Sequence, residues 1–247
     1  MMEFQVLSDP ELLSLKAAEL FIDLSVRCIA TKKKIMVAVS GGSTPRRLYA
    51  LLGSDPYNAQ VDWRYVHFFW VDERFVSPSH EDSNYRLLND NLLNRISIPQ
   101  KNIHPVRTDL LDPQVSARIY EEEIKFSFGL SELSLPRFDL ILLGIGEDGH
   151  TASLFPDSEV LRETERLAAS VMDMKHLHCR ITLTLPVINH AEKIIFLASG
   201  KHKAAVVEKV LIERDRSLPA SLVNPEKGGL IFLLDKDAAI YLDSLTK

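Results

Sequence analysis

Residues 144–150, GIGEDGH, follow an apolar run and combine glycines with side chains that can transfer protons. The glycine spacing G-x-G-x-x-G also matches the phosphate-binding turn of dinucleotide-binding domains. A pyrophosphate over this turn would meet Glu147 and Asp148, and Pro156 would soon interrupt the helix that should support it. The other interpretation is a tight turn that presents Asp148 and His150 together, as in an imidazole oriented by a carboxylate. Taken alone, such a pair could also be a surface histidine beside a surface acid.

A second motif, SGGSTP, follows the apolar run IMVAV and could bind an anion. Gly41 and Gly42 permit a tight turn, Ser43 and Thr44 offer hydroxyls, and Pro45 can occupy the first helical position. Backbone N–H groups at a helix N-terminus carry partial positive charge and favour phosphate. The nucleotide pattern G-x-x-x-x-G-K-[ST] is absent, and a glycine turn capped by Thr44 without any ligand is the alternative.

Charged residues follow two further predicted strands. Asp72, Glu73 and Arg74 are consecutive after YVHFFW: Arg74 could bind a phosphate or carboxylate, while Asp72 or Glu73 could hold a sugar hydroxyl or orient the arginine. A solvated loop or a structural ion pair is the alternative. Lys203, in SGKHKAA, lies near a helix start, where a cation opposes the helix dipole unless it turns toward an anion.

The sequence offers little sign of a metal site. His80 and Asp82 belong to a loop that enters a helix, and the HLH segment at 176–178 lacks a convincing third ligand. We therefore predict no required metal and no cofactor.

The elements that must position these residues alternate along the chain. Apolar runs predict strands at residues 34–40, 65–71, 138–145, 180–185, 193–199 and 229–235, and amphipathic patterns predict helices at 11–30, 44–53, 83–96, 113–128, 201–213 and 236–245, the first with Pro10 in its first turn. Alternation of this kind predicts an α/β fold of the Rossmann-like, doubly wound type, with a mainly parallel central sheet flanked by helices. We see no linker or repeat and expect a single domain over residues 1–247. In such sheets ligands bind beyond the carboxyl ends of the strands.

Composition limits the classes of partner. The net charge of −5 argues against a general nucleic-acid surface, and no apolar run approaches the roughly 20 residues that cross a bilayer. The N-terminal residues lack a signal-peptide pattern. We expect a cytoplasmic protein, a monomer or weak homo-oligomer, that binds a small molecule and neither nucleic acid nor membrane.

Six ordered motifs resemble the glucosamine-6-phosphate isomerase/6-phosphogluconolactonase family: SGGSTP, VDERFVSPSHEDSNY, LGIGEDGHTASLFP, RITLTLPVIN, SGKHKAAV and LPASLVNP. Within that family the chain is most similar to the lactonases. The resemblance implies hydrolysis of 6-phospho-D-glucono-1,5-lactone to 6-phosphogluconate, the second step of the pentose phosphate pathway. It also implies the roles of particular residues. His150 would be the general base and Asp148 would orient it; phosphate would bind to Gly41, Gly42, Ser43 and Thr44 with Arg74 and Lys203; Arg180 would line the pocket.

Two departures separate the chain from the deaminases of that family. The deaminases have a proton-exchanging Glu where this chain has Phe155, and a tyrosine after the Asp-Glu pair where it has Arg74. An isomerase or deaminase acting on a hexosamine 6-phosphate is the enzymatic alternative, and both departures argue against it. A non-catalytic sugar-phosphate sensor is the other, although no helix-turn-helix pattern precedes the first predicted strand.

Overall fold

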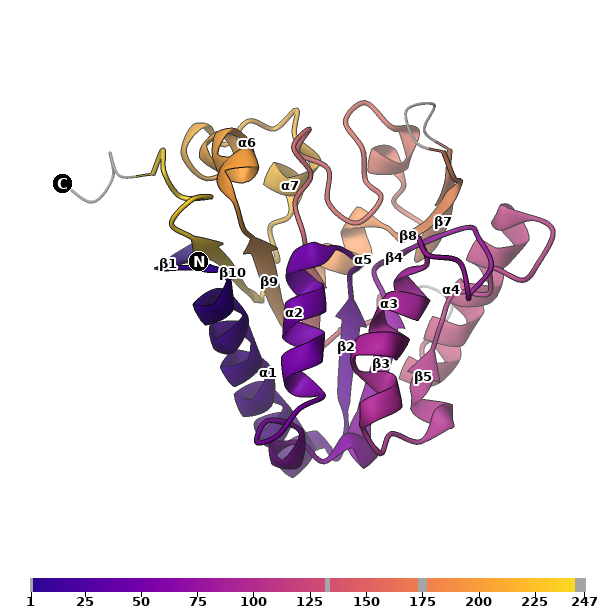
Figure 1. Cartoon of the computed structure of the whole chain (residues 1–247). Helices are drawn as coiled ribbons and strands as arrows, with labels where there is room; N and C mark the ends of the chain where they lie inside the picture. Colours follow the sequence, from indigo (N-terminus) through magenta and orange to yellow (C-terminus); the bar gives the residue numbers. More distant parts are fainter. Residues whose placement is uncertain (1, 132–133, 173–176, 243–247) are drawn as a thin grey trace.

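Seven strands form one parallel sheet, in the spatial order β1-β10-β9-β6-β2-β3-β5 (Figure 1). The computed structural model describes residues 2–131, 134–172 and 177–242. The strands of this sheet are β1 (Met2–Leu7), β2 (Ile35–Val39), β3 (Val66–Trp70), β5 (Ile103–His104), β6 (Leu140–Leu143), β9 (Lys193–Ala198) and β10 (Gly229–Asp235). Every neighbouring pair runs parallel, so the predicted mainly parallel sheet is confirmed.

Helices cover the sheet because its central strands are apolar throughout. All five residues of β2 and all four of β6 are buried, which requires cover on both faces. Figure 1 shows α1 and α2 in front of the strands. The α-helices are α1 (Pro10–Lys32), α2 (Ser43–Leu52), α3 (Asn84–Asn91), α4 (Pro113–Phe128), α5 (Leu185–Asn189), α6 (Ala204–Glu208) and α7 (Pro219–Leu222). Within the described ranges no helix has the length and apolar character needed to cross a bilayer.

Helix starts follow local capping chemistry. The Asp9 side chain accepts a hydrogen bond from the Leu12 N–H at 2.8 Å, and Pro10 is the first helical residue of α1, as predicted. Asp112 caps α4 in the same way, and Gly129, with φ 63°, ends it. The predicted bounds of α4, 113–128, are confirmed.

The order of the strands reverses direction between β2 and β6. From β2 the chain adds β3 and β5 on one side, and then returns to add β6, β9 and β10 on the other. The segments after β2 and β6 therefore diverge, and the divergence leaves a crevice at the carboxyl edge of a doubly wound sheet.

Three strands form a second, antiparallel sheet in the order β4-β8-β7, which the sequence did not predict. They are β4 (Asp72–Arg74), β7 (Ala168–Val171) and β8 (Arg180–Leu183). The prediction of a strand at 180–185 is right about its type, but this strand lies outside the parallel sheet. β1 and β5 were also not predicted.

The predicted C-terminal helix is wrong. Residues 236–241 form turns, and residues 243–245 of the prediction lie outside the described part of the chain. The carboxylate of Asp235 accepts the Ala238 N–H at 2.8 Å, and the Asp235 carbonyl accepts the Ala239 N–H. These bonds form one turn directly after β10, in the manner of a helix N-cap, and the described residues do not continue that turn into a helix.

Candidate active site

An open pocket lies where the segments after β2 and β6 diverge. Its wall also includes the ends of β4, β8 and β9. Eight of the nine predicted site residues line it: Gly41, Gly42, Ser43, Thr44, Arg74, His150, Arg180 and Lys203. The ninth, Asp148, is not among the lining residues but contacts His150, which is. Residues far apart in the sequence are thus brought to one place.

The N-terminus of α2 opens into this pocket without a side-chain cap. The helix begins at Ser43, so Pro45 is its third residue rather than its first. Its N-cap is Gly42, with φ 110°, rather than Thr44, and no described side chain caps it. The backbone N–H groups of the first turn therefore keep their partial positive charge for an anion in the pocket.

Gly41 is required by the close approach of α3. A Cβ atom at Gly41 would collide with the side-chain amide of Asn84, the first residue of that helix. The Asn84 amide in turn donates to the Asp72 carbonyl at 2.8 Å. Sequence reasoning missed Asn84, which also lines the pocket, because only the fold brings α3 against the glycine turn.

Asp72 is a buried carboxylate in the pocket wall. It is 6% exposed and accepts a hydrogen bond from the Ser153 hydroxyl at 2.6 Å. An Arg180 nitrogen lies 3.9 Å from its Oδ2. This carboxylate can therefore hold Arg180 in place or accept a hydrogen bond from a sugar hydroxyl.

Glu73 faces away from the pocket and anchors α3. Its carboxylate accepts hydrogen bonds from the N–H groups of Arg74, Asn84 and Tyr85, each at 2.7 Å. Burial raises the pKa of Glu73 to about 7, although these three N–H groups act in the opposite direction. Of the two acids that could hold a sugar hydroxyl, Asp72 lines the pocket and Glu73 does not.

Two guanidinium groups face the pocket from adjacent strands. Arg74 on β4 and Arg180 on β8 are direct partners in the antiparallel register. Each has a buried Nε atom for which the described residues provide no hydrogen-bond acceptor. Burial, followed by the charge of Arg74, lowers the pKa of Arg180 from its ordinary value, and the nearby acids oppose this. An anion between the two guanidinium groups would satisfy their donors and reduce their repulsion.

The turn after β6 holds an imidazole against a carboxylate. His150 Nδ1 lies 2.6 Å from Asp148 Oδ1, which also accepts the His150 backbone N–H at 3.1 Å. Burial acts to raise the pKa of Asp148, but the charge of His150 and these hydrogen bonds outweigh it and lower that pKa. Gly146 is needed here because a Cβ atom would meet both His150 and Asp148. The pair is thus built into the glycine turn.

Phe155 packs against the imidazole. The two ring centroids are 4.9 Å apart, with the ring planes at 50°. The side chain is 3% exposed and apolar, so it supports the ring of His150 and cannot exchange protons.

Lys203 reaches the pocket from the segment after β9. Gly200, with φ 95°, turns the chain, and its N–H donates to the buried carboxylate of Asp235 at 2.9 Å. The Ser199 hydroxyl donates to the same carboxylate at 2.6 Å. Burial lowers the pKa of Lys203, which Glu147 and Asp148 partly offset. No ion pair involving Lys203 occurs in the described part of the chain, so its charge is available to a ligand.

Outside the pocket, His80, Asp82 and His178 lie close together. The fold thus brings two further candidate ligands to His178 of the HLH segment, a grouping that the sequence did not predict. His176 of that segment lies outside the described residues.

The arrangement joins an anion site to a proton-transfer site. Three cationic side chains and a helix N-terminus line a pocket that also contains the imidazole, and only one carboxylate, Asp72, is among the lining residues. Such a pocket can bind an anionic group and place another part of the same molecule beside a base.

The chain is similar to proteins of one family over most of its length. Residues 8–232 match the family described as glucosamine-6-phosphate isomerases/6-phosphogluconolactonase. A 6-phosphogluconolactonase of Synechocystis sp. is 40% identical over 214 residues, which cover 86% of each chain. One of Nostoc sp. is 36% identical over 240 residues, which cover 96% of this chain and 97% of the relative. The solved structure of a 6-phosphogluconolactonase from Trypanosoma cruzi superposes with a TM-score of 0.88 at 32% identity, over 100% of this chain and 98% of that one.

Proposed function

Because the chain belongs to the glucosamine-6-phosphate isomerase/6-phosphogluconolactonase family, we propose that it hydrolyses 6-phospho-D-glucono-1,5-lactone to 6-phosphogluconate in the pentose phosphate pathway. The observation that carries this proposal is the His150–Asp148 pair in the wall of a pocket lined by Arg74, Arg180 and Lys203.

The phosphate group binds at the uncapped N-terminus of α2 in this proposal. The N–H groups after Gly42 donate to its oxygens, and Arg74 and Lys203 supply full positive charges. Arg180, next to Arg74, contacts the same anion or the sugar. Fixing the phosphate places the lactone carbonyl near the base, and such positioning contributes to the rate by itself.

His150 acts as the general base. Its Nδ1 atom is hydrogen-bonded to Asp148, so we assign proton transfer to Nε2. Nε2 removes a proton from water as the water oxygen attacks the lactone carbonyl carbon. Asp148 fixes the ring and stabilises the imidazolium that forms.

Ring opening completes the reaction. The tetrahedral oxyanion collapses, the bond between the carbonyl carbon and the ring oxygen breaks, and the imidazolium returns its proton to that oxygen. Backbone N–H groups or Arg74 stabilise the oxyanion. The reaction needs neither a covalent nucleophile nor a metal ion in this scheme.

The test is the release of acid from freshly prepared 6-phosphogluconolactone, with and without the protein. We expect hydrolysis well above the spontaneous rate, and a much lower kcat/KM for unphosphorylated gluconolactone. A rate equal to spontaneous hydrolysis would overturn the proposal and favour a sugar-phosphate sensor. Release of ammonia from glucosamine 6-phosphate would favour a deaminase, although Phe155 beside the imidazole argues against that chemistry.

We also retain a cytoplasmic location as part of this proposal. Fractionation of cells that produce the protein tests it, and recovery in an organelle or membrane fraction would contradict it.

A further inference from the structure

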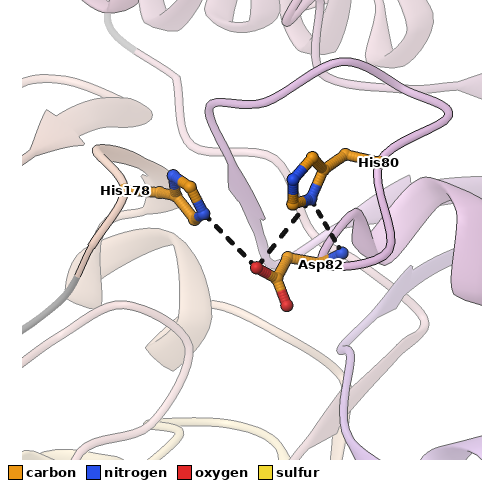
Figure 2. A group of neighbouring side chains, drawn as sticks. All are labelled: His80, Asp82 and His178. Carbon is orange, nitrogen blue, oxygen red and sulfur yellow. Dashed lines mark hydrogen bonds and ion pairs between the residues drawn. The ribbon is translucent and has the colours of Figure 1, made fainter.

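Two histidines and an aspartate from separate parts of the chain converge beside the pocket (Figure 2). His80 and Asp82 belong to the segment between β4 and α3, and His178 lies just before β8. A ring nitrogen from each histidine and a carboxylate oxygen of Asp82 all lie within 4.8 Å of one another. Two imidazoles and one carboxylate form a common ligand set for zinc.

The distances between these atoms approach those around a bound ion. Ligand atoms of tetrahedral zinc are roughly 3.3 Å apart, because each lies about 2.0–2.1 Å from the metal. His178 Nε2 lies 3.3 Å from Asp82 Oδ2, and His80 Nδ1 lies 3.8 Å from the same oxygen. All three atoms lie within 4.8 Å of one another, and the His80 side chain, which is 41% exposed, has room to move closer to the other two.

One atom of the group lacks a well-formed hydrogen bond. The Nε2 atom of His178 is buried, and its contact with Asp82 Oδ2 at 3.3 Å does not have hydrogen-bond geometry. A metal ion bound by both atoms would satisfy this buried nitrogen better than that contact does. His80 Nδ1 does accept a hydrogen bond, from the Asp82 N–H at 3.1 Å. A metal ion would replace that bond, and water can reach the exposed Asp82 N–H in compensation.

We propose that His80, Asp82 and His178 bind one divalent transition-metal ion, with Zn²⁺ as the probe of choice. Borderline nitrogen ligands favour zinc over Mg²⁺ or Ca²⁺, and the exposure of His80 and Asp82 leaves room for water as the fourth ligand. The site is separate from the proposed catalytic pair and supplies no step of the reaction.

The ion would brace the wall of the pocket. Asp82 accepts a hydrogen bond from the Arg74 guanidinium through its carbonyl, and the Phe75 N–H donates to the Cys179 carbonyl at 2.8 Å. The metal ligands therefore flank the junction of β4 and β8, which carries Arg74 and Arg180. A metal bridge across this junction stabilises the folded chain and has a readout independent of lactone hydrolysis.

The experiment is a calorimetric titration of Zn²⁺ into protein freed of metal by a chelator. We expect one ion per chain, with affinity at least about tenfold weaker in each of His80→Gln, Asp82→Asn and His178→Gln. Zn²⁺ should raise the thermal unfolding midpoint of the wild type and not that of the variants. Co²⁺ should give the strong visible absorption of a four-coordinate site in the wild type alone.

His190→Gln is the matched control, since it removes an imidazole outside the group and should keep wild-type affinity. Its Nδ1 atom instead contacts the Pro136 carbonyl. His80 and Asp82 lie in an exposed segment, so their variants keep the test valid even if His178→Gln fails to fold. Absence of Zn²⁺ binding to the wild type, or equal binding by all three variants, would overturn the proposal.

Discussion

The imidazole of His150 is positioned by short-range contacts within its own turn. Asp148 holds Nδ1, Phe155 supports the ring, and the His150 carbonyl accepts the Gly146 N–H at 2.8 Å. The side chain is 30% exposed, so little of the hydrophobic core depends on it. At this position a change in chemistry can be separated from a change in stability.

His150→Asn should reduce kcat on the order of 10² to 10⁴-fold, because it removes the proposed general base. KM and the thermal unfolding midpoint should change little. Steady-state kinetics with the phosphorylated lactone and a melting curve measure both. Near-normal kcat would assign the base elsewhere, with Asp72 the next candidate in the pocket wall.

Lys203→Ala should raise KM with a smaller effect on kcat, because Lys203 contributes charge to phosphate binding and none to proton transfer. Lys201→Ala is the control, since that side chain is exposed and does not line the pocket. Equal effects of the two substitutions would show that both lysines act only through long-range electrostatic attraction, and that Lys203 does not bind the phosphate directly.

At the residue scale, local sequence motifs identified the residues of the pocket better than the residues that hold them in place. His150, Asp148 and Gly41 belong to short motifs whose chemistry is visible in sequence. Asn84 and Ser153 each contact Asp72 across the fold, and no local pattern encodes such a contact. The sequence could not decide between Asp72 and Glu73 for the same reason, since the partners of Glu73 lie at the start of α3.

At the element scale, the segment after β9 is held by one buried carboxylate. Asp235, 2% exposed, accepts hydrogen bonds from Ser199, Gly200 and Ala238. It thereby joins the end of β10 to the turn that carries Lys203.

Asp235→Ala should lower the free energy of unfolding by about 2–4 kcal/mol, because it leaves buried donors without an acceptor. It should also raise KM, since Lys203 loses its support. Urea denaturation and kinetics measure the two effects. A stable variant with unchanged KM would show that the turn keeps its shape without this carboxylate.

The main strands and long helices could be predicted because their apolar periodicity is local. The antiparallel sheet could not be predicted, because β4 has only three residues and its partner β8 lies far along the chain. Strands β5, β6 and β7 come between the two in the sequence. The helix predicted after residue 235 is wrong although Asp235 caps its first turn through the Ala238 N–H, because a local capping signal predicts where a helix can begin and not how far it continues.

At the scale of the whole molecule, one edge of the sheet contains a pair of histidines isolated from the pocket residues. His67 Nδ1 lies 3.0 Å from His104 Nε2, and His104 Nδ1 lies 2.7 Å from Glu123. A neutral His104 can donate its Nδ1–H to Glu123 and accept the Nδ1–H of His67 at its own Nε2. Both hydrogen bonds therefore form when each ring carries one proton and is neutral. Burial, then the charge of His104, lowers the pKa of His67 to about 4.

Stability should therefore fall as the pH drops below 6.5. In the unfolded chain His67 is protonated near its ordinary pKa of about 6.5, whereas in the folded chain it is protonated only near pH 4. Protonation between these two pH values therefore favours the unfolded chain. Because His67 is only half-buried and solvent screens part of this difference, we expect a loss on the order of 1 kcal/mol between pH 7.5 and 5. Urea unfolding at the two pH values measures it, and His67→Gln should flatten the dependence. The same slope in wild type and variant would assign it to other groups.

The excess of cations in the pocket also bears on how the reaction ends. In the proposed hydrolysis the lactone gains a carboxylate, so the product carries one more negative charge than the substrate. Arg74, Arg180 and Lys203 attract that charge, and only Asp72 in the lining opposes it. Attraction between such charges weakens as added salt screens them. Product inhibition should consequently be strong at low ionic strength and relax with salt more steeply than KM does, because departure of the product depends on one more charge than capture of the substrate.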